Sequence, residues 1–167
     1  EASTFEHQMA RVHTMLDRGS ERYLGHYADA IERMSTKYGE SVQSLTSGTY
    51  DILSASVPAA QAMKVLETNV RAARGGFTDT ATAVKASVGI LNAYGMAAGE
   101  ISDVTNLMHK IVKRGVITFE ELAQNVGTVT SLAAVLDVDL EAVGATIATM
   151  TRAGIGAEIS MTALRSI

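Results

Sequence analysis

The stretch GILNAYGMAAGEISD, residues 89–103, contains the end of one helical pattern, a stop and the start of another. Gly95 permits the chain to reverse there, because glycine adopts left-handed backbone conformations at little cost. We expect Leu91 and Tyr94 to pack where the first helix ends and Asn92 to hydrogen-bond to the turn. A protein-binding role for an exposed Tyr94 is the alternative.

Similar stops recur along the chain, and apolar residues at helical spacing lie between them. No segment shows the alternation typical of a strand, so the pattern predicts an all-α fold. A chain interrupted about every 20 residues folds back on itself into antiparallel helices. The predicted breaks are Gly39, Ser56, Gly76, Gly95, Gly115, Asp137 and Gly154.

Three of these breaks are evenly spaced. The interval from Gly76 to Gly115 equals the interval from Gly115 to Gly154, and each glycine follows basic residues at a predicted helix end. A period near 39 with two helices per unit predicts stacked antiparallel helical hairpins. Because basic side chains suit the negative end of a helix, we expect these glycines at the left-handed position that ends it.

Helix starts are marked by capping residues. Thr118 and Glu121 match the capping box, in which two side chains satisfy each other's free backbone N–H groups. Ser56 and Asp139 are predicted to cap the helices that follow them.

Charged side chains are concentrated near the beginning of the chain, where they are roughly twice as frequent at positions 1–40 as at positions 41–167. We therefore predict two parts, a long helical arm at 1–38 and a compact helical module at 39–167. The apolar residues of the arm follow a heptad-like seam, typical of a coiled coil that forms a weak homo-oligomer. An amphipathic helix lying on its own domain is equally compatible. The seam consists of Phe5, Met9, Val12, Leu16, Tyr23, Tyr27 and Met34.

Composition excludes several functions. The net charge of −4 argues against general nucleic-acid binding, and the absence of Cys excludes disulfides and thiolate-bound metals. The four His are not spaced as metal ligands, and no phosphate-binding loop, nucleophile motif or base–nucleophile set occurs. We predict a non-enzymatic protein without a cofactor. Because the chain begins with Glu1 rather than Met, we expect it to be a piece of a larger protein.

Several segments resemble the core region of phage tail tape measure proteins, in their order and at their distances. They run from about Tyr38 to Ile167 and include GFTDT after Gly75, LNAYG after Ile90, and VKRGVITFEELAQNVGTV from Val112. The other matching segments are YGESVQSLTSGTYDILSASV, ISDV, LDVDLEAVGATIATMTRAGI and TALRSI. Residues 1–37 show no such resemblance.

This resemblance implies a structural protein of the virion that sets tail length while tube subunits polymerise around it and leaves the tube ahead of the genome. It implies tail tube protein, tail assembly chaperones and tail-tip proteins as partners. The expected location is the tail tube lumen or tip, and the host cytoplasm during assembly. Two alternatives remain open: an α-helical repeat adaptor that binds a protein partner, and a membrane-active helical protein.

Overall fold

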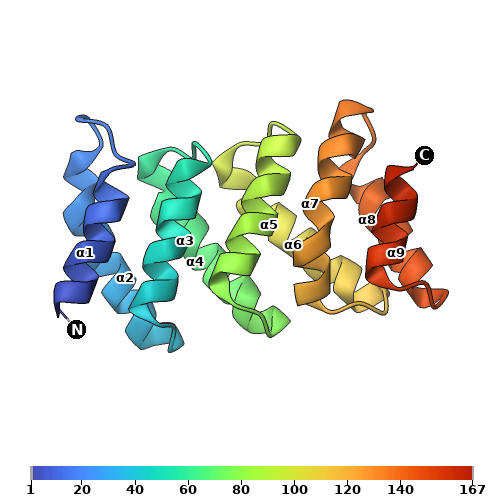
Figure 1. Ribbon diagram of the computed structural model, residues 1–167, viewed down its shortest axis with the longest axis horizontal. Helices are drawn as coiled ribbons and strands as arrows, with labels where there is room; N and C mark the ends of the chain where they lie inside the picture. Colours follow the sequence, from blue (N-terminus) through green and yellow to red (C-terminus); the bar gives the residue numbers. More distant parts are fainter. Residues whose placement is uncertain (1, 167) are drawn as a thin grey trace.

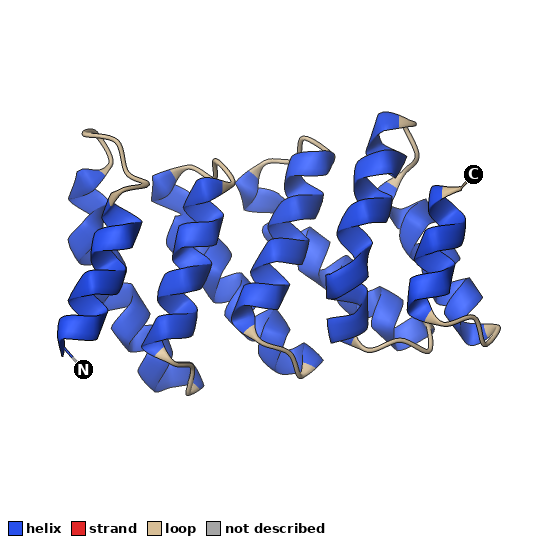
Figure 2. Cartoon of the chain, viewed as in Figure 1, coloured by secondary structure: helices blue, strands red, loops and turns tan. Residues whose placement is uncertain are grey.

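The computed structural model describes residues 2–166, in which there are nine α-helices and no strand (Figures 1 and 2). The all-α prediction is confirmed. The helices are α1 Ala2–His13, α2 Leu24–Tyr38, α3 Val42–Ser54, α4 Ala59–Gly76, α5 Thr80–Ala93, α6 Ile101–Arg114, α7 Phe119–Val135, α8 Leu140–Arg152 and α9 Ala157–Arg165. Two short 3-10 helices, η1 Glu21–Tyr23 and η2 Ala98–Glu100, precede α2 and α6.

The helices form two layers of antiparallel hairpins stacked side by side. The odd-numbered helices α1 to α9 pack against one another in one layer, and α2 to α8 lie behind them (Figure 1). The two ends of the chain lie at opposite ends of the stack. The turns after α1, α3, α5 and α7 form the upper edge in Figure 1, and those after α2, α4, α6 and α8 form the lower edge. This is the architecture of an α-solenoid.

A single cluster of buried side chains runs through the stack between the two layers. It extends from Met9 and Val12 in α1 to Met161 in α9. Alanine and valine contribute many of its members, such as Ala62 and Val65 in α4. Small side chains allow helix axes to approach closely, so the sequence composition suits this two-layer packing.

Three of the four upper-edge turns share one way of ending a helix. Ser56, Gly95 and Asp137 follow α3, α5 and α7 with φ of +65°, +61° and +58°. In each case the next residue donates its N–H to the carbonyl near the end of the preceding helix, as Met96 does to Leu91 at 2.9 Å. The prediction that Ser56 caps α4 is therefore wrong: Ser56 ends α3, and Pro58 occupies the N-cap position of α4.

At the lower edge, two glycines do not adopt the predicted left-handed conformation. Gly76 is the last residue of α4, and the left-handed residue is Phe77, with φ of +55°. Gly115 follows α6 with an extended backbone at φ −97°. Gly39 and Gly154, which follow α2 and α8, are left-handed, at φ +68° and +85°.

The physical role of Gly76 and Gly115 is close approach. A Cβ atom on Gly76 would lie 2.4 Å from Cγ of Phe119, the first residue of α7. A Cβ atom on Gly115 would lie 2.6 Å from Oγ1 of Thr151 in α8. Gly76 therefore makes room for α7, and Gly115 makes room for α8, rather than for their own turns.

Side-chain caps begin several helices. Thr118 accepts the N–H of Glu121 at 3.1 Å, and a Glu121 carboxylate oxygen accepts the N–H of Thr118 at 2.8 Å. Ser41 and Asp79 cap α3 and α5. Asp139 occupies the N-cap position of α8, although its side chain makes no capping hydrogen bond.

The predicted single long helix at the N-terminus is wrong. The chain forms α1, a turn at 14–20 and α2, and these helices make the first hairpin of the stack (Figure 1). Asp17 stabilises the turn by accepting the N–H of Ser20 at 2.8 Å. This local turn interrupts the heptad-like pattern at the point where it also lapses in the sequence, around Gly19.

The seam residues of this hairpin face the interior of the same chain. Met9, Val12, Tyr27 and Met34 are buried, and Phe5, Leu16 and Tyr23 pack against them. The Tyr27 hydroxyl donates to the carbonyl of Ala59 at 2.7 Å, and burial raises the pKa of Tyr27 to about 12. Self-association through these side chains would therefore require the hairpin to open.

Replacing a buried side chain of this hairpin tests its place in the core. Ile31 in α2 is fully buried, so Ile31→Ala should lower the free energy of unfolding by about 2–5 kcal/mol. The neighbouring Glu32 is exposed, and Glu32→Ala should change it by less than about 0.5 kcal/mol. Urea unfolding of both variants gives the comparison. Equal, small effects would show that the hairpin is not part of the cooperative core.

Three glycine substitutions distinguish a glycine in open space, a glycine with positive φ and a glycine at a close approach between helices. Gly89→Ala, in open space within α5, should stabilise by about 0.5–1 kcal/mol. Gly95→Ala should cost about 1 kcal/mol because of the positive φ, and Gly76→Ala about 1–3 kcal/mol because of the clash with Phe119. The order of the midpoints in chemical denaturation checks this, and Gly76→Ala as stable as Gly89→Ala would refute the close approach.

Candidate interaction surface

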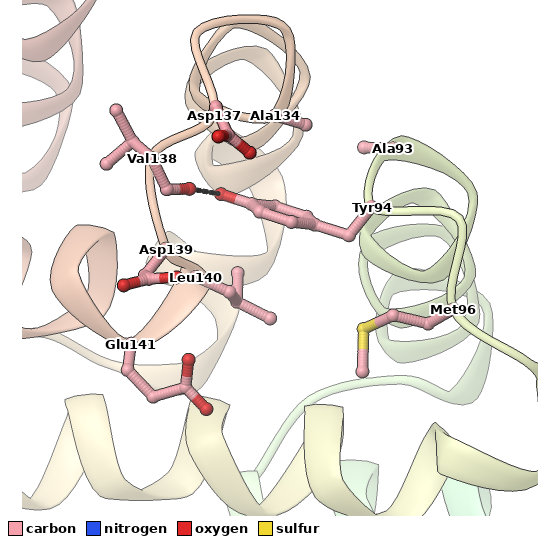
Figure 3. Close-up of a pocket in the computed structure, with 9 residues that line it drawn as sticks. All are labelled: Ala93, Tyr94, Met96, Ala134, Asp137, Val138, Asp139, Leu140 and Glu141. Atoms are coloured by element: carbon pink, nitrogen blue, oxygen red, sulfur yellow. Dashed lines mark hydrogen bonds between the residues drawn. The ribbon is translucent and has the colours of Figure 1, made fainter.

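The turn at 91–96 connects α5 to η2 and joins neighbouring hairpins along the upper edge. Asn92 donates from Nδ2 to the carbonyl of Ala55, in the preceding upper turn, at 3.1 Å. Tyr94 donates from its hydroxyl to the carbonyl of Val138, in the following upper turn, at 3.0 Å (Figure 3). Two side chains of one turn therefore tie three successive hairpins together.

A hollow of about 350 Å³ lies between this turn and the turn that follows α7. Figure 3 shows the Tyr94 ring reaching across it from the α5 side toward Val138. One wall is apolar and the other carries three carboxylates. The lining residues are Ala93, Tyr94, Met96, Ala134, Asp137, Val138, Asp139, Leu140 and Glu141.

The electrostatics of this hollow keep Tyr94 in its neutral, donating form. Burial raises the pKa of Tyr94, and the nearby carboxylates of Asp139 and Glu141 raise it further. No cationic side chain lines the hollow, so its acidic rim favours a basic or neutral partner group.

Two histidines have contacts within the fold. The His109 ring in α6 packs at a tilt of 41° against the Phe119 ring, with 4.8 Å between ring centroids, next to Gly75. His13 lies 3.8 Å from a carboxylate oxygen of Glu21. Among residues 2–166, no group of His, Asp and Glu side chains is arranged to hold a metal ion.

Sequence reasoning placed Asn92, Tyr94 and Gly95 at a turn, and the structure places them there. It did not find their partners. Ala55 and Val138 are distant in the chain and contribute only backbone carbonyls, so their residue types carry no signal. The repeat spacing was the one feature of the sequence that indicated these contacts, because equivalent turns of stacked hairpins lie next to each other.

Stacked hairpins with turn-to-turn contacts define the class: an α-helical repeat protein. A family model described as "Phage-related minor tail protein" matches residues 28–167. The chain belongs to this family. It is thus a phage tail protein, and the family places it in the virion tail.

One similar protein of this kind is a "Probable tape measure protein" of Clostridium phage phiCD119, which is 30% identical over 119 residues. The match covers 69% of this chain and 13% of that protein, so this chain spans a small part of its relative. No solved structure matches this chain.

The length and hydropathy of the helices within residues 2–166 do not suit any of them to crossing a membrane.

The Tyr94 hydrogen bond can be removed without changing the ring. Tyr94→Phe should lower the free energy of unfolding by about 0.5–1.5 kcal/mol, because the Val138 carbonyl loses its donor. Tyr50→Phe is the matched control, since within the described residues the Tyr50 hydroxyl has no hydrogen-bond partner. Thermal unfolding of both variants measures the difference. Identical melting temperatures would show that the hydrogen bond from Tyr94 to Val138 does not stabilise the fold.

Proposed function

We propose that this chain is a folded block within a phage tail tape measure protein. The family match over residues 28–167 carries this proposal, and the similarity to a probable tape measure protein supports it. In this proposal the whole protein sets tail length while tube subunits polymerise around it. It works with tail tube protein, assembly chaperones and tail-tip proteins, and it leaves the tube at genome ejection.

The stacked hairpins are better suited to binding other tail components than to measuring tail length. As one continuous helix, residues 2–166 would extend about 250 Å at about 1.5 Å per residue. The longest helix of the stack, α4, has 18 residues and therefore spans about 27 Å. We infer that the measuring length lies mainly in the remainder of the protein, while this block contacts other tail components.

The proposed location is the tail tube lumen or the tail tip in the virion, and the host cytoplasm during assembly. The turns that line both edges of the stack offer contact surfaces there, because they lie in two rows along it (Figure 1).

The test is a deletion in the full-length protein of a phage that carries it. Removing residues 39–167 should reduce the number of assembled tails at least about tenfold, and the remaining tails should keep their length. Removing an equal number of residues from an uninterrupted helical region should shorten tails by about 190 Å, at about 1.5 Å per residue. Electron microscopy of lysates gives both counts and lengths.

Two outcomes contradict the proposal. Tails in normal number that are shortened by about 190 Å after the first deletion would show that this segment is part of the ruler. Tails unchanged in number and length would show that the block has no role in assembly.

A further inference from the structure

The lower turns that follow α4, α6 and α8 each carry a large apolar side chain that is exposed rather than buried in the core. Phe77 is 95% exposed, Val116 74% and Ile155 36%. They follow α4, α6 and α8 and are equally spaced in the sequence. The turns that carry them lie in a row along the stack (Figure 1). We call Phe77, Val116 and Ile155 the apolar row.

The fold itself does not need these side chains. Phe77 has a left-handed backbone, a conformation that glycine adopts more readily, and α8 ends with Gly154 in the same conformation. An exposed aromatic residue in a strained conformation is thus explained neither by its turn nor by the core. Exposed apolar side chains gathered in this way mark an interaction surface.

Opposite charges flank the apolar row. On the side of the even-numbered helices, the last turns carry the exposed basic residues Lys37, Arg74, Lys113, Arg114 and Arg152. On the side of the odd-numbered helices, the N-cap position of α5 and the first turns of α7 and α9 carry the exposed acidic residues Asp79, Glu120, Glu121 and Glu158. Because each lower turn joins an even-numbered helix to the next odd-numbered one, the apolar row lies between a basic row and an acidic row.

We propose that the lower edge binds a second copy of this chain, edge to edge, around a two-fold axis parallel to the stack. That rotation places each apolar side chain against its own copy in the partner. It also exchanges the two layers, so the basic row of one copy faces the acidic row of the other. The edge is therefore self-complementary, as a two-fold interface requires. Both chains then run in the same direction.

Charge favours a second copy over a lipid surface as the occupant. An anionic membrane would attract the basic row but repel the acidic row beside it. Within residues 2–166 the structure has two salt bridges, His13 with Glu21 and Lys37 with Glu67, so most charges of the two rows have no ionic partner within the chain. A single edge is a small surface, and we expect weak association, below about 1,200 Å² of total buried area. This inference does not depend on the proposed function.

Single cysteines test the symmetry, because the chain has none of its own. Phe77→Cys and Val116→Cys should each form a disulfide between two copies under mild oxidation, since each residue faces itself across the axis. Val135→Cys, on an exposed residue beside the upper edge, is the control and should remain monomeric. An equal mixture of the Phe77→Cys and Ile155→Cys chains should give the two homodimers and little mixed product.

Sedimentation of variants tests the surface. Phe77→Gly with Val116→Ser and Ile155→Ser should weaken dimerisation at least about tenfold without lowering the melting temperature. Val135→Ser with Leu136→Ser, which alters exposed apolar residues near the upper edge, should dimerise like the natural chain.

Charge exchange tests the facing rows. Arg114→Glu with Arg152→Glu reverses two charges of the basic row, and Glu120→Lys with Glu158→Lys reverses the two charges that face them in the acidic row of the partner copy. Each chain alone should be monomeric, whereas a mixture should form heterodimers.

Several results would overturn the proposal. These are a natural chain that stays monomeric at the highest attainable concentration, a mixture of charge variants without heterodimers, and mixed Phe77–Ile155 disulfides as the main product. Flotation with vesicles of phosphatidylcholine and phosphatidylglycerol that requires the apolar row, in a chain that does not dimerise, would instead identify a lipid surface as the occupant.

Discussion

Every hairpin of this protein has an apolar face that only the neighbouring hairpin can cover. Burial of that face supplies most of the stability of such a fold, because isolated helices as short as α9 or even α4 are marginal in water. The buried cluster therefore continues from Val12 to Met161 without being centred on one helix. Two polar residues inside it are paired: Ser87 donates to Asn69 at 2.7 Å, and Asn69 donates to the Val65 carbonyl at 3.0 Å. The buried hydroxyl of Thr80, by contrast, has no hydrogen-bond partner among the described residues.

The relative position of successive hairpins is set at their ends. At the lower edge, Gly76 brings α4 close to α7 and Gly115 brings α6 close to α8, where the Val116 N–H donates to Thr151 at 3.2 Å. At the upper edge, the side chains of Asn92 and Tyr94 reach the turns on either side. Because protein interiors are densely packed, these contacts leave little freedom in how one hairpin sits on the next.

The charged residues at the helix ends have a local explanation, whereas the exposed apolar residues do not. Basic groups at helix exits and acidic groups at helix starts complement the helix dipoles. At the lower edge the same arrangement gives a repeating pattern of charge. The lower edge is therefore the most informative surface of the stack.

The sequence by itself determined the all-α class and the approximate helix breaks, because these depend on local periodicity, glycine and capping residues such as Thr118 and Glu121. It also carried the resemblance to tape measure proteins, which the family match over residues 28–167 confirms. Tertiary structure decided what depends on residues distant in the chain: the folding of residues 2–38 into the first hairpin, the close approach at Gly76, and the partners of Asn92 and Tyr94. The heptad-like seam shows why. An apolar stripe indicates that a helix packs against a partner. The stripe has the same residue pattern whether that partner is a second chain or α3 and α4 of its own chain, so the sequence cannot distinguish the two.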